Sequence, residues 1–151
     1  VLEYAKELHV SEDKTYRALA LSNLIAIHQK TGIGRLSAYC GAVSAGAAAG
    51  AGIAYLCGGG YEEVIHTVVN ALAIVSGMVC DGAKASCAAK IAASVDAGIL
   101  GYNMYLQGQQ FYAGDGIITK GIEGTIDNVG RLGKDGMKET NEEIIRIMIN
   151  D

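Results

Sequence analysis

The stretch LSAYCGAVSAGAAAGAGIAYLC at 36–57 decides the fold, because it holds 22 residues without a charge and consists mostly of Ala, Gly and Ser. A segment of this length is in principle long enough to cross a bilayer. Its few large aliphatic residues give it a weak transfer energy, however, and a helix that is apolar on all sides also suits the centre of a helical domain. We therefore expect a buried helix over about 35–56, in which Gly41, Ala45, Ala48 and Gly52 let neighbouring backbones approach closely.

A helix is predicted before this segment, from Ser11, a good N-cap, to about Lys30. Its apolar side chains recur at helical spacing, at Tyr16, Leu19, Ala20, Leu24 and Ile27. Gly32 and Gly34 are expected to end it. The stretch 1–6 also has a helical pattern and shows neither an initiator Met nor a leader, so we expect a fragment of a longer protein or a processed chain.

Two more helices are predicted after the glycine turn at 58–60, an amphipathic one over about 61–78 and an alanine-rich one over about 83–106. The polar side of the first is expected to carry Glu63, His66, Thr67 and Asn70. Together with the two helices before them, they make four long helices.

The C-terminal part is punctuated by glycine from 108 to 136, with a short helix predicted around 118–132. A last helix is expected to start with a capping box, in which Thr140 and Glu143 satisfy each other's end groups. Alternating strand patterns are missing. The predicted fold class is therefore all-α: one compact multi-helix domain with a buried small-residue central helix and a Gly-rich C-terminal segment.

Charge and cysteine content narrow the function classes. The chain has 12 basic against 16 acidic residues and no basic stripe, which argues against nucleic acid as a partner. The central apolar segment is interpreted as a protein core, so no membrane partner is expected. Four cysteines without a secretory signal favour reduced thiols and a cytoplasmic location over a disulfide framework.

Two of the cysteines, Cys80 and Cys87, bracket the expected start of a helix. A seven-residue separation on a continuous helix spans about 10 Å, so both can hold one small cluster only if the first lies in the loop before the helix. Cys40 is expected on the small-residue helix, where small neighbours leave room for an inorganic cluster. The alternative is that these thiols pack as small buried hydrophobes, since C-x-x-C spacing is absent, and a structural zinc site is weaker still.

Three segments carry a resemblance to a known family: KTGIGRLSAYCGA at 30–42, GMVCDGAKASCAAKI at 77–91 and NVGRLGKDGM at 128–137. Together they resemble the C-terminal half of bacterial L-cysteine desulfidases, which are themselves similar to the alpha chain of iron-sulfur L-serine dehydratases. The similarity covers nearly the whole chain. It implies an iron-sulfur domain of the serine dehydratase alpha-chain type over 1–151.

The resemblance implies a 4Fe-4S cluster held by three cysteines, with one iron left open. By position the ligands are Cys40, Cys80 and Cys87, and Cys57 is expected to be a packed thiol in a turn. Such a cluster can be absent from a sample prepared in air. The serine dehydratases have a longer interval between the last two ligands, which favours the desulfidase branch.

The implied activity is elimination of HS⁻ from L-cysteine to give pyruvate, ammonia and sulfide, with Lewis-acid help from the open iron. The family's N-terminal half, a separate substrate-closing domain with a proposed catalytic base, is missing, so this chain alone is expected to be inactive. That domain and a small amino acid, cysteine or serine, are the expected partners, and a homo-oligomer remains open. Arg35 is a candidate to bind the substrate carboxylate, or else a surface charge at a helix end.

Other polar residues near the motifs have simpler interpretations. Asp81 is expected to cap the helix that follows it, while Lys84 could offset the negative charge of the cluster. His66 is expected to be solvated and His28 to interact with terminal carbonyls of its helix, so neither is assigned a catalytic role. Two rival functions stay open: an L-serine dehydratase subunit, which expels water, and a non-catalytic helical assembly module whose cysteines merely pack.

Overall fold

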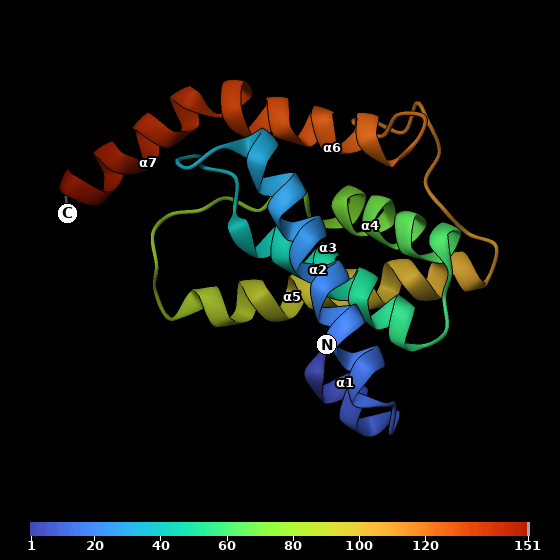
Figure 1. Ribbon diagram of the computed structural model, residues 1–151. Helices are drawn as coiled ribbons and strands as arrows, with labels where there is room; N and C mark the ends of the chain where they lie inside the picture. The colour runs from blue at the N-terminus through green and yellow to red at the C-terminus, as the bar shows by residue number, and fades with distance from the viewer. Residues whose placement is uncertain (151) are drawn as a thin grey trace.

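The computed structural model describes residues 1–150 and confirms the all-α prediction, because this part of the chain contains seven α-helices and no strand. The elements are α1 (Leu2–Glu7), α2 (Glu12–Ile33), α3 (Gly41–Leu56), α4 (Tyr61–Val75), α5 (Ser86–Leu106), α6 (Ile122–Arg131), the π-helical turn η1 (Leu132–Gly136) and α7 (Lys138–Asn150). The four long helices expected from the sequence are α2 to α5. Figure 1 shows α6, η1 and α7 crossing one side of this group as an almost continuous rod.

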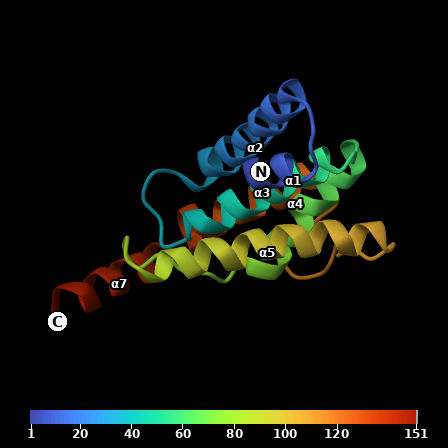
Figure 2. The same ribbon diagram turned by 90° about the horizontal axis from the view of Figure 1, so that it is seen from below.

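Helix α3 is the centre of the domain, as predicted, and eleven of its 16 residues are buried. It lies between α2 and α5, which pack on opposite sides of it (Figure 2). It begins at Gly41, later than expected, because residues 34–40 form a non-helical segment with bends, and Cys40 serves as the N-cap. Of the small residues singled out in the sequence, Gly52 does face a neighbouring helix and Ala48 is fully buried, whereas Gly41 and Ala45 are exposed.

Helices α3 and α5 touch through backbone atoms. A Cβ atom added to Gly46 would lie 2.4 Å from the Cβ of Ser94, and one added to Gly50 would lie 2.6 Å from the Cα of Gly98. The two contacts follow one another by four residues on both helices, so α3 and α5 run in the same direction at this crossing. Their N-terminal ends are therefore brought to the same side of the domain.

Helix α2 begins and ends as the sequence predicts. The Ser11 Oγ accepts a hydrogen bond from the Lys14 backbone N–H at 3.3 Å, and Gly34, with φ +90°, forms the C-cap. The apolar set that recurs at helical spacing is not the buried face, however. Tyr16, Leu24 and the other members stay exposed or half-buried, because the helix meets α3 through Ala18, a small residue on another face.

Helix α4 buries part of the side that was expected to be polar. Thr67 and Asn70 are both fully buried. The Asn70 amide donates to the Gly101 carbonyl oxygen at 3.0 Å and accepts from the Phe111 backbone N–H at 3.1 Å, so its polar atoms are satisfied inside the protein. The prediction of a solvated side was wrong here because α4 packs on both α3 and α5, and Gly101 lets α5 approach closely.

The C-terminal helices differ from expectation at their boundaries. The helix predicted around 118–132 is α6 followed by the turn η1, and α7 starts before Thr140. The capping box of Thr140 and Glu143 is absent, because the chain passes from η1 into α7 almost without a break and the Asn141 N–H already donates to the Met137 carbonyl at 2.9 Å. None of the helices in residues 1–150 is both long and apolar enough to cross a membrane.

Replacing Gly50 with Ala tests the close contact of α3 with α5. The new methyl group has no room beside Gly98, so we expect the free energy of unfolding to fall by about 1–3 kcal/mol. This loss opposes the intrinsic helix preference of Ala over Gly, which is about 1 kcal/mol in the other direction. Urea unfolding followed by circular dichroism measures the change.

Gly41→Ala is the matched control, because a Cβ at Gly41 would meet nothing within 4 Å. We expect this variant to differ from the original chain by less than about 1 kcal/mol. A Gly50→Ala variant as stable as Gly41→Ala would contradict the packing described for these helices.

Candidate functional site

Two segments that lie far apart in the sequence are joined next to Cys40 and Cys80. The Cys40 backbone N–H donates to the Met78 carbonyl oxygen at 3.2 Å, and the Cys80 N–H donates to the Ala38 carbonyl oxygen at 2.6 Å. The segment before α3 is thus fastened to the segment after α4. The cysteines predicted as ligands on these two segments are brought together by the backbone itself.

The geometry of this junction places Cys40 and Cys80 beside one bridge. Tyr39 and Val79 form an isolated antiparallel bridge, and Cys40 and Cys80 each follow the bridged residue on its own segment. Cys40 and Cys80 therefore occupy diagonal positions across the bridge, and both pack in or against the same buried cluster. Residues at such diagonal positions lie about 7–8 Å apart.

Cys87 reaches the same region from the first turn of α5. Its Sγ lies 3.6 Å from the Gly82 carbonyl oxygen, which belongs to the loop that follows Cys80. Cys80 and Cys87 are both half-buried, whereas Cys40 is buried, with 5% of its surface exposed. The loop between Cys80 and Cys87 is the arrangement that two ligands at this spacing require.

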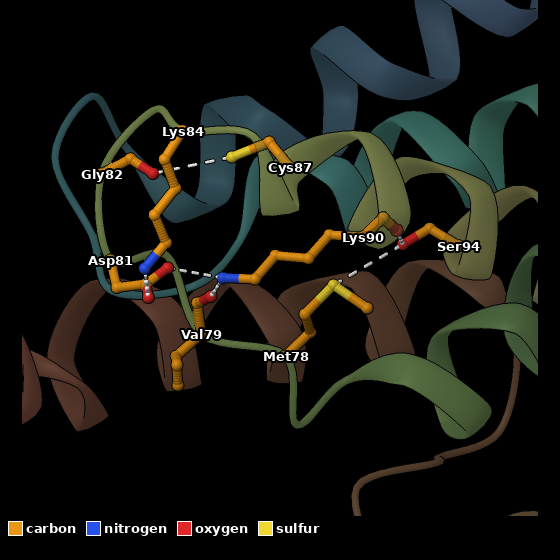
Figure 3. A network of polar contacts seen from close by, with 8 residues as sticks. All are labelled: Met78, Val79, Asp81, Gly82, Lys84, Cys87, Lys90 and Ser94. Carbon is orange, nitrogen blue, oxygen red and sulfur yellow. Dashed lines mark hydrogen bonds and ion pairs between the residues drawn. The ribbon is translucent and has the colours of Figure 1, made fainter.

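Lys90 ties the loop to α5 (Figure 3). Its ammonium group donates to the Val79 carbonyl oxygen at 2.9 Å and to Asp81 Oδ1 at 2.5 Å. The hydrogen bond to Asp81 is the main reason why the pKa of Lys90 is raised, and burial of the ammonium works against this shift. Lys90 thus places a positive charge at the loop that carries Cys80, one helical turn after Cys87.

Asp81 pairs with both Lys84 and Lys90 and does not cap α5, which begins at Ser86 without a side-chain cap. The prediction of a cap was wrong because the helix starts later than the sequence suggests, beyond the reach of Asp81. Its hydrogen bonds with Lys84 and then Lys90 hold the pKa of the Asp81 carboxyl well below its usual range. These contacts therefore stabilise the loop fully above the ordinary carboxyl pKa, and that stabilisation is lost only as the pH falls toward the lowered value.

The third motif segment, 128–137, contacts the same site through Gly133. The Ser37 hydroxyl donates to the Gly133 carbonyl oxygen at 2.6 Å and accepts from the Tyr39 backbone N–H at 2.9 Å. A Cβ on Gly133 would come within 3.2 Å of the Tyr39 Cβ, so only glycine fits there without a shift of its neighbours. The segments 30–42, 77–91 and 128–137 therefore meet around the Tyr39–Val79 bridge.

Cys57 lies apart from the other cysteines. It is the C-cap of α3, at the opposite end of a 16-residue helix from Cys40, a span of about 24 Å. Its thiol is exposed, so the expectation of a packed thiol was wrong, because the turn at the end of α3 faces solvent. All four cysteines are free thiols in the structure.

A site for a single metal ion is not formed by the side chains described in residues 1–149. Nowhere among them do three or more His, Cys, Asp or Glu side chains converge as one ion would require. A four-iron cluster makes a different demand, because its cysteine ligands bind different iron atoms and stand apart from one another. The spacing of Cys40 and Cys80 across the bridge suits the larger group.

The other sequence candidates lie elsewhere. Arg35 is exposed and lines a surface groove of about 350 Å³ with Ile27, Lys30, Thr31 and Gly34, and this groove contains no cysteine. Its assignment to a substrate carboxylate stays a prediction.

The two histidines differ from expectation. His28 Nε2 lies 2.7 Å from Glu123 Oε2 on α6, and so it pairs with another helix instead of with terminal carbonyls. His66 is half-buried and stacks on Tyr105, with ring centroids 4.5 Å apart, because α5 packs over this part of α4. Neither histidine lies beside the cysteines.

Sequence reasoning missed Lys90 and Ser37. Lys90 follows Cys87 by three residues, so the two share one face of a helix, and this spacing was a usable signal. Ser37 offered no such signal, because its partner Gly133 lies 96 residues away.

The chain belongs to the serine dehydratase alpha chain family, whose model matches residues 1–146. That match includes all three segments that meet at the bridge.

The chain is also similar to longer proteins, each called a UPF0597 protein, a name that states no activity. It is 70% identical to one from Desulfitobacterium hafniense and 59% identical to one from Lachnoclostridium phytofermentans, over 99% of this chain in both cases. A relative from Treponema denticola is 52% identical over the full chain. The chain spans about one third of these relatives, between 35% and 36% of their length. No solved structure matches it.

Replacing Lys90 with Met tests whether this side chain holds the site together. Met keeps the apolar stem but removes the contacts with Val79 and Asp81. We expect the backbone amides of Cys40 and Cys80 to exchange hydrogen several-fold faster, because the joined segments then open more often. Amide hydrogen exchange resolved by residue measures this, and amides in the middle of α3 are expected to stay unchanged.

Lys84→Met is the matched control, since Lys84 is half-exposed and bonds only to Asp81. It is expected to leave exchange at Cys40 and Cys80 close to the original rate. Equal acceleration in both variants would show that Lys90 has no special part in the site.

Proposed function

We propose that the chain is the cluster-binding domain of a lyase that eliminates HS⁻ from L-cysteine, giving pyruvate, ammonia and sulfide. The proposal is supported by the backbone link beside Cys40 and Cys80 and by the contact of Cys87 with the loop that follows Cys80, at the aligned starts of α3 and α5. Membership of the serine dehydratase alpha chain family supports β-elimination from a small amino acid as the reaction type.

The residues present fit a 4Fe-4S cluster held by three thiolates. Cys40, Cys80 and Cys87 supply three sulfur ligands, and the fourth cysteine, Cys57, is about 24 Å away along α3. One iron is therefore left without a protein thiolate. The Lys90 ammonium, bonded to the loop that carries Cys80, would offset part of the negative charge of such a group.

When bound, the cluster supplies a Lewis acid at its open iron, where it can help the leaving group depart. The chain's own residues hold the three cysteines in position. Lys90 and Asp81 fix the loop that carries Cys80, and the Tyr39–Val79 bridge fixes Cys40 against it. Burial of Cys40 keeps water away from one side of the site.

The elimination also requires the transfer of a proton from the substrate to a base. A base removes the α-proton of the amino acid while HS⁻ leaves from the β-carbon, and the resulting enamine takes up water to give pyruvate and ammonia. None of the histidines near the motifs lies beside the cysteines, so we assign the base to another part of a longer polypeptide. Arg35 is proposed to bind the substrate carboxylate if that part brings the substrate to its groove.

A second candidate is L-serine dehydration, which has the same chemistry with water as the leaving group. The description of the matching family, serine dehydratase alpha chain, favours it directly. The two candidates make the same demands on Cys40, Cys80 and Cys87 and differ only in the group expelled.

The test uses the full-length polypeptide that carries this chain, purified and reconstituted with iron and sulfide without oxygen. We expect a brown protein with about four irons per chain, which releases sulfide from L-cysteine. Cys40→Ser, Cys80→Ser and Cys87→Ser are each expected to lose most of the iron and the turnover. Iron content and the visible spectrum give a readout independent of activity.

Cys57→Ser is the matched control, and it is expected to keep both the iron and the turnover. A larger kcat/KM for serine than for cysteine would favour the dehydratase. No iron uptake by a well-folded protein would favour the non-catalytic assembly module.

A further inference from the structure

The outer face of α2 carries a line of large apolar side chains that nothing in residues 1–150 covers. Tyr16 is 60% exposed, Leu24 is 65% exposed and Ile27 is 61% exposed. These residues recur at helical spacing and so lie along one side of the helix, with Ala20 between them. We call this the α2 stripe. Single exposed apolar residues are ordinary on a protein surface, but a continuous line of them indicates a binding site for another protein surface.

The stripe continues toward the cysteine site. Beyond the end of α2, Leu36 is 91% exposed, and a groove lined by Ile27, Lys30 and Arg35 lies at the C-terminal end of the helix. Lys30 and Arg35 form no ion pair with any group described in residues 1–150. The face is therefore apolar along α2 and positively charged at the end nearer Cys40.

The length of the relatives indicates what covers this face. The similar proteins from Desulfitobacterium and Treponema are about three times as long as this chain, which accounts for 35% of each. Most of such a polypeptide therefore lies outside this chain and is available to cover its surface. A face with this composition fits an intramolecular partner, because a permanent contact removes the apolar side chains from water.

We propose that the remaining part of the longer polypeptide docks on the α2 stripe, presenting an apolar surface to Tyr16, Leu24 and Ile27 and carboxylates to Lys30 and Arg35. This shares with the proposed function the premise that the chain belongs to a longer protein, but it does not depend on the cluster. Helix α2 leads directly through Gly34 into the segment that ends at Cys40. A part docked along α2 therefore borders the cysteine site.

The experiment measures how fast a maleimide reagent labels cysteines introduced into the full-length polypeptide, with each site identified by peptide mass. Leu24→Cys and Ile27→Cys are placed on the stripe. Leu106→Cys at the end of α5 is the control, because Leu106 is 57% exposed and lies on another surface. We expect both stripe positions to react at least about tenfold more slowly than the control, as buried groups do.

Labelling at Leu24→Cys and Ile27→Cys as fast as at Leu106→Cys would overturn the proposal. Slow labelling that disappears on dilution, together with a dimer in sedimentation, would also overturn it and assign the stripe to a second copy of the chain. A second variant, Leu24→Glu, is expected to restore fast labelling at Ile27→Cys while the iron content is unchanged. Failure of the cluster proposal leaves these labelling rates unaffected, so the two proposals fail separately.

Discussion

The direct contact between the backbones of α3 and α5 is the constraint on which the rest of the structure depends. Gly46 meets Ser94 and Gly50 meets Gly98, so the two helices run in the same direction with a fixed register. One helical turn earlier, the same register sets residue 42 against residue 90. The start of α3, with Cys40, and the start of α5, with Cys87 and Lys90, thus lie at the same end of the domain. The two backbones can approach this closely only through small residues, which explains why 36–57 is so rich in them.

Polar contacts then fix the positions of the cysteine-bearing segments, which the helix packing sets only approximately. The Tyr39–Val79 bridge fastens two extended segments, Lys90 fastens the loop, and Ser37 fastens the first segment to η1. Each of these contacts joins residues of different motif segments or spans the cysteine loop. The three motifs therefore describe one place in the molecule, although they are spread over 108 positions from 30 to 137.

Much of the fold could be predicted from the sequence, because it depends on local signals. The Ser11 cap, the glycine turn after α3 and the small-residue character of 36–57 all indicated the elements that the structure contains. The failures depend on tertiary contacts. The apolar spacing on α2 could not reveal that Ala18 faces the core, and the polar side of α4 is buried because Gly101 admits α5. The predicted capping box at Thr140 does not form, because a π-helical turn leads directly into α7, and no local sequence pattern predicted that turn.

Only those features of the candidate site that lie within one sequence motif could be predicted. The spacing of Cys80 and Cys87 required a loop between them, and the structure has one. The partners of that loop, Lys90 and Ser37, depend on contacts across the fold, as does the diagonal arrangement of Cys40 and Cys80. The assignment of the three cysteines as ligands stays a prediction, because it concerns a bound iron-sulfur cluster and not the fold of the chain.

The measurement that most directly tests the central claim, that Cys40, Cys80 and Cys87 form one site, is cross-linking of the reduced, iron-free chain with a short bifunctional thiol reagent. We predict links that join Cys40, Cys80 and Cys87 to one another within single chains, with Cys57 modified only at one end of the reagent. Links from Cys57 to any of the three in a monomer, or no links among the three while each still reacts singly, would contradict it.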